Sequence, residues 1–402
     1  MNKPVNKSGN VRILASHAGA RAIRQELSRR HFLSLAALAG AGVALSACGS
    51  DGGGGASSAV EPGGGATGGP VEKSLSIYTW GDYDSPEVID AFGKTGPKVT
   101  LDSYGSNEEL ISKLVAAEGT SGYDIVVPTG VYIPQLIENE IIVPLNKDLI
   151  PNMAKVDPKF LGQDWDPENE YSVCKCWGTT GFVYDTTVIK RDLATWDDFI
   201  DAMQNEASGK TSLLDDPQGV AGLYFWANGI DWNTEDMADY DAYEAEAVEK
   251  WAPHIAGFDS YPATGAMQQN TFALMQNWNG DSRLGILEHK QPDRWKWVLP
   301  GPTTELWMDN WCIPTGAPHP EAAHAFLDYV LEPENSFLEM DYIGYNTGAL
   351  GIEEMAAERK VELPEMIFFN DEQLATMKNG AVNEAQNRRT EVYDKLKAAA
   401  SA

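Results

Sequence analysis

A single aspartate between two tryptophans gives residues 306–314 (LWMDNWCIP) their chemical interest. Asp309 lies between Trp307 and Trp311, in a run whose β-branched and aromatic residues are typical of a strand. A carboxylate beside indole rings suits an organic cation, because the acid supplies charge-assisted hydrogen bonds and the ring faces attract ammonium groups. The alternative is a buried strand that carries an acid for structural reasons. Other parts of the sequence are needed to distinguish the two interpretations.

The composition is that of an acidic, globular protein. The chain has 402 residues, of which 43% are hydrophobic, so it can form two domains with a sizeable core. Its formal net charge of -29 argues against nucleic acid as a partner, because there is no basic surface that could release counterions. Negative charge is compatible with the binding of cations, but it is also a common means of staying soluble.

The N-terminus has the features of an export signal. Residues 28–33 (SRRHFL) are similar to the twin-arginine motif, and the apolar run 32–45 is too short to span a bilayer as a mature helix. Residues 45–48 (LSAC) are similar to a lipobox. We therefore expect cleavage before Cys48, a lipid on its thiol, and export to the outer face of the cell membrane or the periplasm. A secreted protein without the lipid, cleaved nearby, is the alternative.

Three cysteines follow Cys48, and each could form a disulfide, bind a metal or remain a free thiol. Cys174 and Cys176 share a face if they lie on a strand, so they are not expected to bond each other. A disulfide between one of them and Cys312 is a hypothesis that an exported protein permits, and buried, unpaired thiols are the alternative. Three cysteines without a nearby pair of histidines make a poor zinc pattern, so we expect no metal and no cofactor.

The elements that would position these residues follow an α/β pattern. Strands and helices alternate at the start of the folded body, which predicts a parallel sheet whose ligands bind beyond the carboxyl ends of the strands. The expected strands are 74–80, 99–101 and 123–128, with helices that begin at Ser85-Pro86 and at a capping box, 106–109. Later we expect a strand at 178–188 and helices from Trp196 (capped by Thr195) and at 236–251, 272–277, 319–331 and 381–399.

Several short stretches, each weak alone, share their order with one family. They are WGDY at 80–83, YDIVVP at 123–128, DPENEYS at 166–172, LLDD at 213–216, WNG at 278–280, WMD at 307–309 and IGY at 343–345. On these stretches the chain, from about Leu75 to Leu396, resembles the extracytoplasmic solute-binding proteins of ABC importers. Within them it is similar to the spermidine/putrescine-binding group.

The resemblance implies a fold and a mode of action. The fold class is α/β, a two-lobe fold like that of type II periplasmic binding proteins, hinged by crossing strands. The lobes close around a solute, and the closed face docks on a membrane-embedded ABC permease that works with its ATPase. The implied divisions are a signal peptide at 1–47, the lipidated cysteine and a flexible Gly/Ser-rich linker at 48–71, one lobe at 72–179 plus 308–353, and the other at 180–307 plus 354–402.

The resemblance also assigns residues to the ligand. A polyamine carries ammonium charges on apolar linkers, so carboxylates at intervals with aromatic walls between them suit it. Asp309 matches the main acid for one amine, Asp216 an acid for the other end, and Asp82 keeps an acid where the family often has glutamate. Trp80, Tyr83, Trp278, Trp307 and Tyr345 match the aromatic walls, Thr129 stands where the family has serine, and Asn383 stands where it has a glutamine amide.

Two positions depart from the family. Val131 stands where the family has a tyrosine, and Gly219 stands where the better-known members have a glutamate that holds the terminal amine. The loss of an aromatic and an acid leaves the polyamine open and admits a shorter or differently substituted amine. Acids and aromatics of 226–232, including Asp231, are candidate replacements.

Other functions have to be weighed against this one. A receptor for another small cation or amino-acid derivative is the nearest alternative, followed by a secreted hydrolase and an adhesin. The sequence has no G-x-S-x-G elbow, no H-E-x-x-H motif and no phosphate loop. Asp215 and Asp216 could serve a glycosidase, but adjacent residues of a strand point to opposite faces. We therefore expect a binding protein rather than an enzyme.

Overall fold

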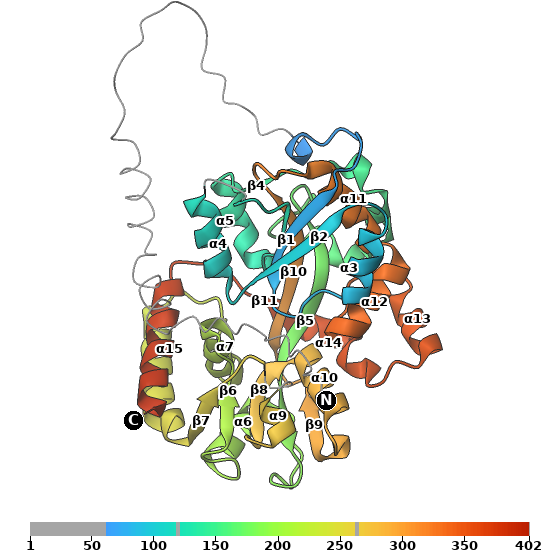
Figure 1. The fold of residues 1–402 in the computed structure, drawn as a ribbon. Helices are drawn as coiled ribbons and strands as arrows, with labels where there is room; N and C mark the ends of the chain where they lie inside the picture. Colours follow the sequence, from blue (N-terminus) through green and yellow to red (C-terminus); the bar gives the residue numbers. More distant parts are fainter. Residues whose placement is uncertain (1–61, 118–120, 262–264, 402) are drawn as a thin grey trace, which may run out of the picture. The chain divides into compact units, whose positions relative to one another are not determined.

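The computed structural model describes residues 62–117, 121–261 and 265–401 (Figure 1). The predicted signal peptide, Cys48 and most of the predicted linker lie outside the described residues. Within these ranges, no helix reaches the length and apolar character that a membrane span requires.

The first strands form the predicted parallel sheet. β1 (Ser74–Trp80) pairs in parallel with β2 (Lys98–Tyr104) on one side and with β3 (Ile125–Val126) on the other. Helices α3 (Pro86–Gly93) and α4 (Asn107–Ala116) form the connections. Both helices begin where the sequence predicted, and β3 is shorter than the expected strand.

Only half of the predicted capping box is present at the start of α4. Ser106 Oγ accepts a hydrogen bond from Glu109 N at 3.2 Å, as expected. The Glu109 carboxylate reaches one residue further back and accepts from Gly105 N at 2.9 Å, so the reciprocal bond to Ser106 was predicted wrongly.

Two long antiparallel strands lie at the centre of the sheet. β5 (Ser172–Asp185) is buried along its whole length and pairs with β10 (Thr304–Pro314). In Figure 1 the two strands run together from the part that holds β1, β2 and β3 to the part that holds β6 to β9. The strand expected at 178–188 begins earlier, at Ser172, because Lys175 is buried through ion pairs and so does not end the apolar run.

The segment expected as a helix at 272–277 forms a strand instead. β8 (Leu274–Trp278) pairs with β5 on one side and with β6 (Thr211–Leu213) on the other. A short apolar run fits a buried helix or a buried strand equally well, so its neighbours decide. Here two flanking strands satisfy the backbone groups of β8, which a sequence pattern cannot show.

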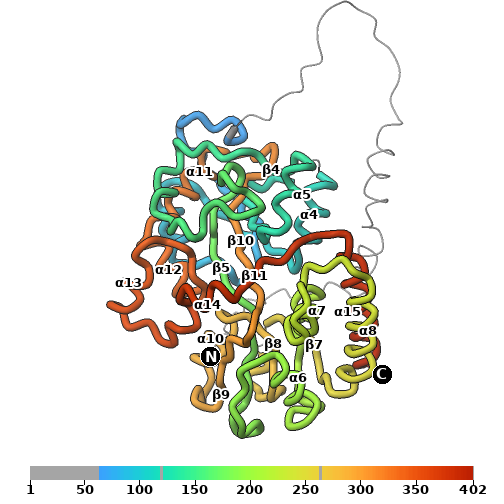
Figure 2. The backbone as a smooth tube through the Cα atoms, turned by 180° about the vertical axis from the view of Figure 1, so that it is seen from behind, coloured from blue at the N-terminus to red at the C-terminus, as the bar shows by residue number. Residues whose placement is uncertain are grey.

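Helices pack against both parts of the sheet. α7 (Pro217–Ala227), α8 (Met237–Glu246) and α15 (Gln386–Ala400) lie side by side beyond β6 and β7 (Ile255–Phe258) in both Figure 1 and Figure 2. The predicted helices at 236–251 and 319–331 are present, and α15 begins later than the expected Ala381. The remaining elements are β4 (Ile142–Val143), α5 (Ile133–Glu138), α6 (Trp196–Gln204), α9 (Ala266–Gln269), α10 (Asn279–Glu288), β9 (Trp295–Val298), α11 (Pro320–Val330), α12 (Pro333–Ile343), α13 (Ile352–Arg359), α14 (Asp371–Thr376) and β11 (Met377–Asn379).

Two large hydrophobic clusters lie along the long strands, one at each end of β5. One gathers Val126, Trp177 and Trp311 around the first strands, and the other gathers Phe182 and Trp196 near α6 to α8. β5 contributes to both, since its earlier residues belong to the first cluster and its later residues to the second. The crossing strands therefore join two separately packed cores.

Of the two possibilities for the cysteines, the described chain shows free thiols and no disulfide. Cys174, Cys176 and Cys312 are buried free thiols. The β5–β10 register explains this, because Cys312 stands opposite Ser172 and Cys174 stands opposite Asn310. Diagonal neighbours across a ladder have Cα atoms about 7–8 Å apart, which exceeds the reach of a disulfide.

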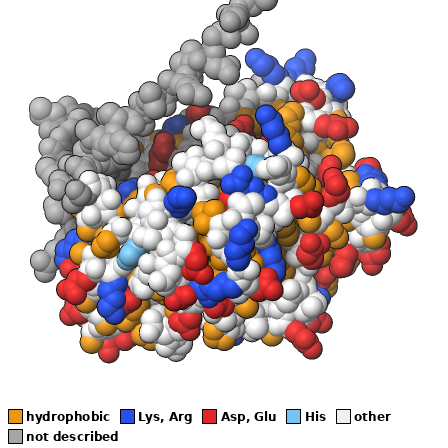
Figure 3. All heavy atoms as spheres, turned by 90° about the horizontal axis from the view of Figure 1, so that it is seen from below, with side chains coloured by type: hydrophobic (Ala, Val, Ile, Leu, Met, Phe, Trp, Pro, Cys, Tyr) orange, Lys and Arg blue, Asp and Glu red, His pale blue; other side chains and the backbone are white. Residues whose placement is uncertain are grey.

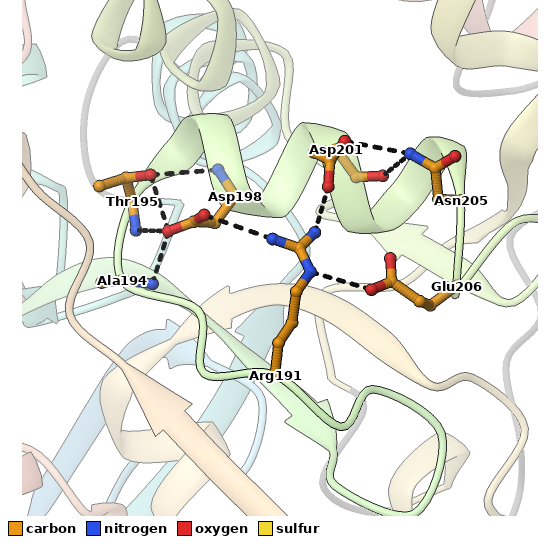
Figure 4. A network of polar contacts seen from close by, with 7 residues as sticks. All are labelled: Arg191, Ala194, Thr195, Asp198, Asp201, Asn205 and Glu206. Carbon is orange, nitrogen blue, oxygen red and sulfur yellow. Dashed lines mark hydrogen bonds and ion pairs between the residues drawn. The ribbon is translucent and has the colours of Figure 1, made fainter.

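A polar network holds the start of α6 (Figure 4). Asp198 Oδ2 accepts from Thr195 N at 3.0 Å and from Ala194 N at 2.9 Å, and Thr195 Oγ1 accepts from Asp198 N at 3.1 Å. Arg191 lies beside this capping box, with Nε donating to Glu206 at 2.9 Å and ion pairs to two further acids of the network. The cap and the arginine together fix the loop that enters α6.

Thr195→Ala is expected to lower the free energy of unfolding by about 1 kcal/mol, because the first turn of α6 loses its side-chain acceptor. Urea unfolding measures the loss. Thr195→Ser is the matched control, since it keeps the hydroxyl and should stay close to the wild type. Equal stability of the alanine and serine variants would contradict the role of the cap.

Charged side chains are distributed rather than gathered on the face seen in Figure 3. Acidic and basic groups are interspersed there with uncharged ones. On that face, the net charge of -29 therefore does not form one continuous acidic patch.

Candidate functional site

One face of β10 carries the residues of chemical interest. Glu305, Trp307 and Asp309 alternate along the strand, so their side chains lie on the same face. Trp307 stands opposite Gly178 of β5, and Asp309 stands opposite Cys176. A Cβ at Gly178 would lie 2.5 Å from Trp307 Cζ2, so the indole ring needs a glycine beneath it. The local geometry thus places an aromatic ring between two acids.

Asp309 is buried and already hydrogen-bonded. It is 6% exposed, and its carboxylate accepts from Thr129 Oγ1 at 2.7 Å and from the Tyr83 hydroxyl at 2.9 Å. Burial raises the pKa of Asp309 to about 6, against the two hydrogen bonds and the Lys175 charge, which favour the ionised form. The structure therefore brings together three of the residues predicted for the site.

A second layer orients Thr129. Asn107 Nδ2 donates to Thr129 Oγ1 at 3.0 Å, and Thr129 N donates to Asn107 Oδ1 at 3.0 Å. The hydroxyl oxygen accepts from the amide, so its proton is directed to Asp309. Asn107 belongs to the first turn of α4 and is buried, which fixes the pair.

Four of the predicted aromatic residues gather beside Asp309. Trp307 meets Tyr345 edge to face, with ring centroids 4.9 Å apart, and Tyr83 lies 6.2 Å from Tyr345. Trp278 packs in the same cluster and stands opposite Thr180 in the β5–β8 ladder. The fifth, Trp80, packs on Tyr104 and belongs with the first core. The gathered rings give a wall that suits methylene groups and ammonium charges.

Asp216 caps a helix. It is the N-cap of α7 and accepts from Gly219 N at 2.5 Å. Burial raises its pKa to about 6, with Glu108 adding to the rise and Arg389 opposing it. The Tyr132 hydroxyl donates to Glu108 at 3.0 Å. The predicted acid of the second end is therefore part of a small acidic group, with one oxygen used by the helix.

Three candidates lie in turns. Asp82 is exposed, with φ at 54°, directly after β1. The Asn383 amide donates to Asn233 O at 2.7 Å and accepts from Ala385 N at 3.2 Å, so both of its groups are used locally before α15. Asp231, the candidate replacement acid, is exposed and accepts from Asn233 N in a turn.

Sequence reasoning missed two acids of this region. Glu305 is half-buried and accepts from Thr180 Oγ1 at 2.6 Å. Asp281, which directly follows the WNG stretch, accepts a hydrogen bond from the Tyr345 hydroxyl. Burial raises the pKa of Asp281 to about 6 and that of Glu305 to about 8. Glu305 could have been predicted from the sequence, because it alternates with Trp307 and Asp309 along the strand.

A buried ion cluster lies behind the site. Lys175 Nζ lies 2.8 Å from Asp84 and 3.5 Å from Glu339, and all three side chains are at most 2% exposed. The ammonium also lies 4.2 Å from the centroid of the Trp311 ring and 5.0 Å from that of Tyr83. The second tryptophan of the opening stretch thus faces a cation of the protein itself, in the core.

A hollow of about 510 Å³ lies on the other face of β10. Leu306 and Met308, which alternate with the acids, form its floor, and the ion pair of Lys159 with Asp371 lies at its edge. It holds no group of acids among its lining residues, so the chemistry expected for a cation lies on the opposite face.

Comparisons with known proteins agree on a family. Residues 87–364 match the family model described as bacterial extracellular solute-binding protein. The chain is 30% identical over 336 residues to a spermidine/putrescine-binding periplasmic protein of Escherichia coli, covering 81% of this chain and 92% of that one. It is 28% identical over 324 residues to a putrescine/agmatine-binding protein of Pseudomonas aeruginosa, covering 76% and 86%.

A solved structure agrees with the fold. The crystal structure of a spermidine/putrescine ABC transporter substrate-binding protein from Streptococcus pneumoniae superposes with a TM-score of 0.70 at 26% identity. The match covers 82% of this chain and the whole of that one. The predicted α/β fold of type II periplasmic binding proteins is confirmed.

Proposed function

The chain belongs to the bacterial extracellular solute-binding proteins, and from this premise we propose that it captures a polyamine, such as spermidine or putrescine, for an ABC importer. The observation that carries the proposal is Asp309, a buried carboxylate with oriented donors, beside the rings of Trp307 and Tyr345. The similarity to a spermidine/putrescine-binding and a putrescine/agmatine-binding protein supports it.

The proposed role of Asp309 is to bind one ammonium group. A carboxylate has about four acceptor positions, and Thr129 and Tyr83 occupy two of them. The remaining positions can accept from an ammonium group, while the two hydroxyl donors hold the carboxylate in place. The adjacent rings then cover the methylene chain and exclude water, which strengthens the charge-assisted bond.

We propose that capture involves two lobes, 72–179 plus 308–353 and 180–307 plus 354–402. The two hydrophobic clusters, joined by β5 and β10, support two lobes. Phe369 and Met377, which this division assigns to the second lobe, pack in the first cluster. Closure of the lobes around the amine would complete the site, and the closed face would dock on a membrane-embedded permease coupled to an ATPase. A lipid on Cys48, with 48–71 as linker, would hold the receptor at the membrane.

Affinity for the amine is expected to fall as the pH is lowered from 7 to 5. The pKa of Asp309 is about 6 in the free protein, and a bound ammonium group favours the ionised form. The bound state therefore holds fewer protons than the free state, while the amines stay charged throughout. Titrations at several pH values measure the trend, and an affinity that is constant over this range would contradict carboxylate recognition.

Tryptophan fluorescence of the purified protein tests the proposed function. Titrations with spermidine, putrescine, agmatine and arginine should give a saturable signal for a polyamine, because Trp278 and Trp307 lie at the site. Saturation by arginine alone would favour a receptor for another cation or amino-acid derivative. The absence of a response in a protein shown to be folded would move the ligand to another class of solute.

A further inference from the structure

A second acid, Glu305, lies on the other side of Trp307 from Asp309 along β10. Glu305 is on the same face of β10, and its pKa responds to the charges of both Asp309 and Asp216. Along this face of β10, Asp309 therefore forms one acidic pole and Glu305 the other, with Trp307 between them.

The spacing of the poles selects for ligand length. Glu305 and Asp309 are four positions apart on a regular part of the strand, which places their Cα atoms about 13 Å apart. An extended chain advances about 1.2 Å per bond, so the nitrogens of a four-carbon diamine lie about 6 Å apart and the outer nitrogens of spermidine about 11 Å apart. The outer nitrogens of spermidine match this spacing more closely than those of a four-carbon diamine, so the longer molecule is favoured for contact with both poles.

The neighbours of Glu305 belong to the same site. Thr180, which donates to its carboxylate at 2.6 Å, stands opposite Trp278 in the β5–β8 ladder. Trp307 is two positions away on β10. A ligand chain that leaves Asp309 along the Trp307 ring would thus reach Glu305 between two of the tryptophans already assigned to the site.

We propose that Glu305 is a specificity-determining residue that binds the distal ammonium group of a long polyamine. The assignment rests on the proposed function and extends it to a preference for triamines over diamines. The acid that the resemblance placed at position 219 has then been replaced by one on β10. A side chain at position 219 would be tightly packed, because a Cβ there would meet Leu214 Cδ1 at 3.1 Å and Asp216 Oδ1 at 3.3 Å.

The charges that face Glu305 do not neutralise it. Arg389 lowers its pKa, but this guanidinium is directed to Tyr240 and Gln386 at 3.0 and 3.1 Å. Lys378 stands beside Glu305 in the β10–β11 ladder and is exposed, and no ion pair joins the two in the described chain. Burial, with two acids adding to its effect, raises the pKa of Glu305 to about 8, so a bound ammonium group favours release of a proton from Glu305 near neutral pH.

Glu305→Gln, which keeps the size of the side chain and removes its charge, tests the proposal in the full-length protein. Calorimetric titrations with spermidine, putrescine and n-butylamine at pH 7, in two buffers of different ionisation enthalpy, give affinity and proton release together. We expect spermidine affinity to fall at least tenfold, putrescine and butylamine affinity to change less than threefold, and proton release on spermidine binding to decrease.

The control is Glu138→Gln, an exposed acid of α5, which should leave all three titrations unchanged. Thr180→Val, which removes the hydroxyl donor, should produce a smaller loss for spermidine alone. Unchanged spermidine affinity and proton release in a folded Glu305→Gln variant would overturn the role of Glu305 while leaving polyamine capture intact. Failure of the wild type to bind any amine would overturn the proposed function itself.

Discussion

Lys175→Met is expected to lower the free energy of unfolding by about 3–5 kcal/mol, the largest loss of stability that the structure predicts. The substitution keeps an apolar chain of similar length but leaves Asp84 and Glu339 buried without their counter-charge. Burial already raises the pKa of Glu339 to about 7 in the presence of Lys175. Urea unfolding at pH 8 measures the change.

The pH dependence separates this mechanism from simple loss of packing. Glu339 holds its proton to a higher pH in the folded chain than in the unfolded chain, so its contribution to stability falls as pH rises from about 4.5 to 7. Without Lys175, which lowers the pKa of Glu339, this acid is protonated more readily, and the loss should shrink toward pH 5. Lys296→Met, which breaks an ion pair with Asp192 at an exposed surface, should cost less than about 1 kcal/mol. Equal losses in the two variants would contradict the account.

Asp309→Ala is expected to weaken polyamine binding by about 2–4 kcal/mol, which is about 30- to 900-fold in Kd. The variant removes a buried, charge-assisted acceptor and leaves the hydroxyl groups of Thr129 and Tyr83 without it. Calorimetry with the preferred polyamine measures the loss.

The fold of the Asp309 variant should be retained, since the removed carboxyl has a raised pKa and contributes little favourable energy in its ionised form. Asp341→Ala, an exposed acid of α12, is the matched control and should bind as the wild type does. Unchanged affinity in a folded Asp309→Ala variant would show that the amine binds elsewhere.

Local signals predicted much of the fold. The cap of α6, the proline at the start of α3 and the apolar alternation of β1 lie within a few residues of the elements they specify, and all three appear in the structure. β8 could not be predicted in this way, because its conformation depends on pairing with β5 and β6, which are distant in the sequence. The sequence left the state of the cysteines open for the same reason, since the register of β5 and β10 sets which side chains meet.

The residues of the site also divide into those that the sequence alone predicted and those that it did not. The sequence pointed to Asp309, Tyr83 and Thr129, and the structure brings them within hydrogen-bonding distance. Glu305 was missed because matching to a family transfers only the acids that the family shares. Lys175 was missed because a lysine in a sequence is normally predicted to be exposed. Its burial depends on Asp84 and Glu339, which are distant in the sequence.

A crystal structure of the protein with bound spermidine tests the central claim most directly. We expect one ammonium nitrogen within hydrogen-bonding distance of the Asp309 carboxylate, with the methylene chain against Trp307. A ligand in the hollow formed by Leu306 and Met308, with the contacts among Asp309, Tyr83 and Thr129 unchanged, would contradict it.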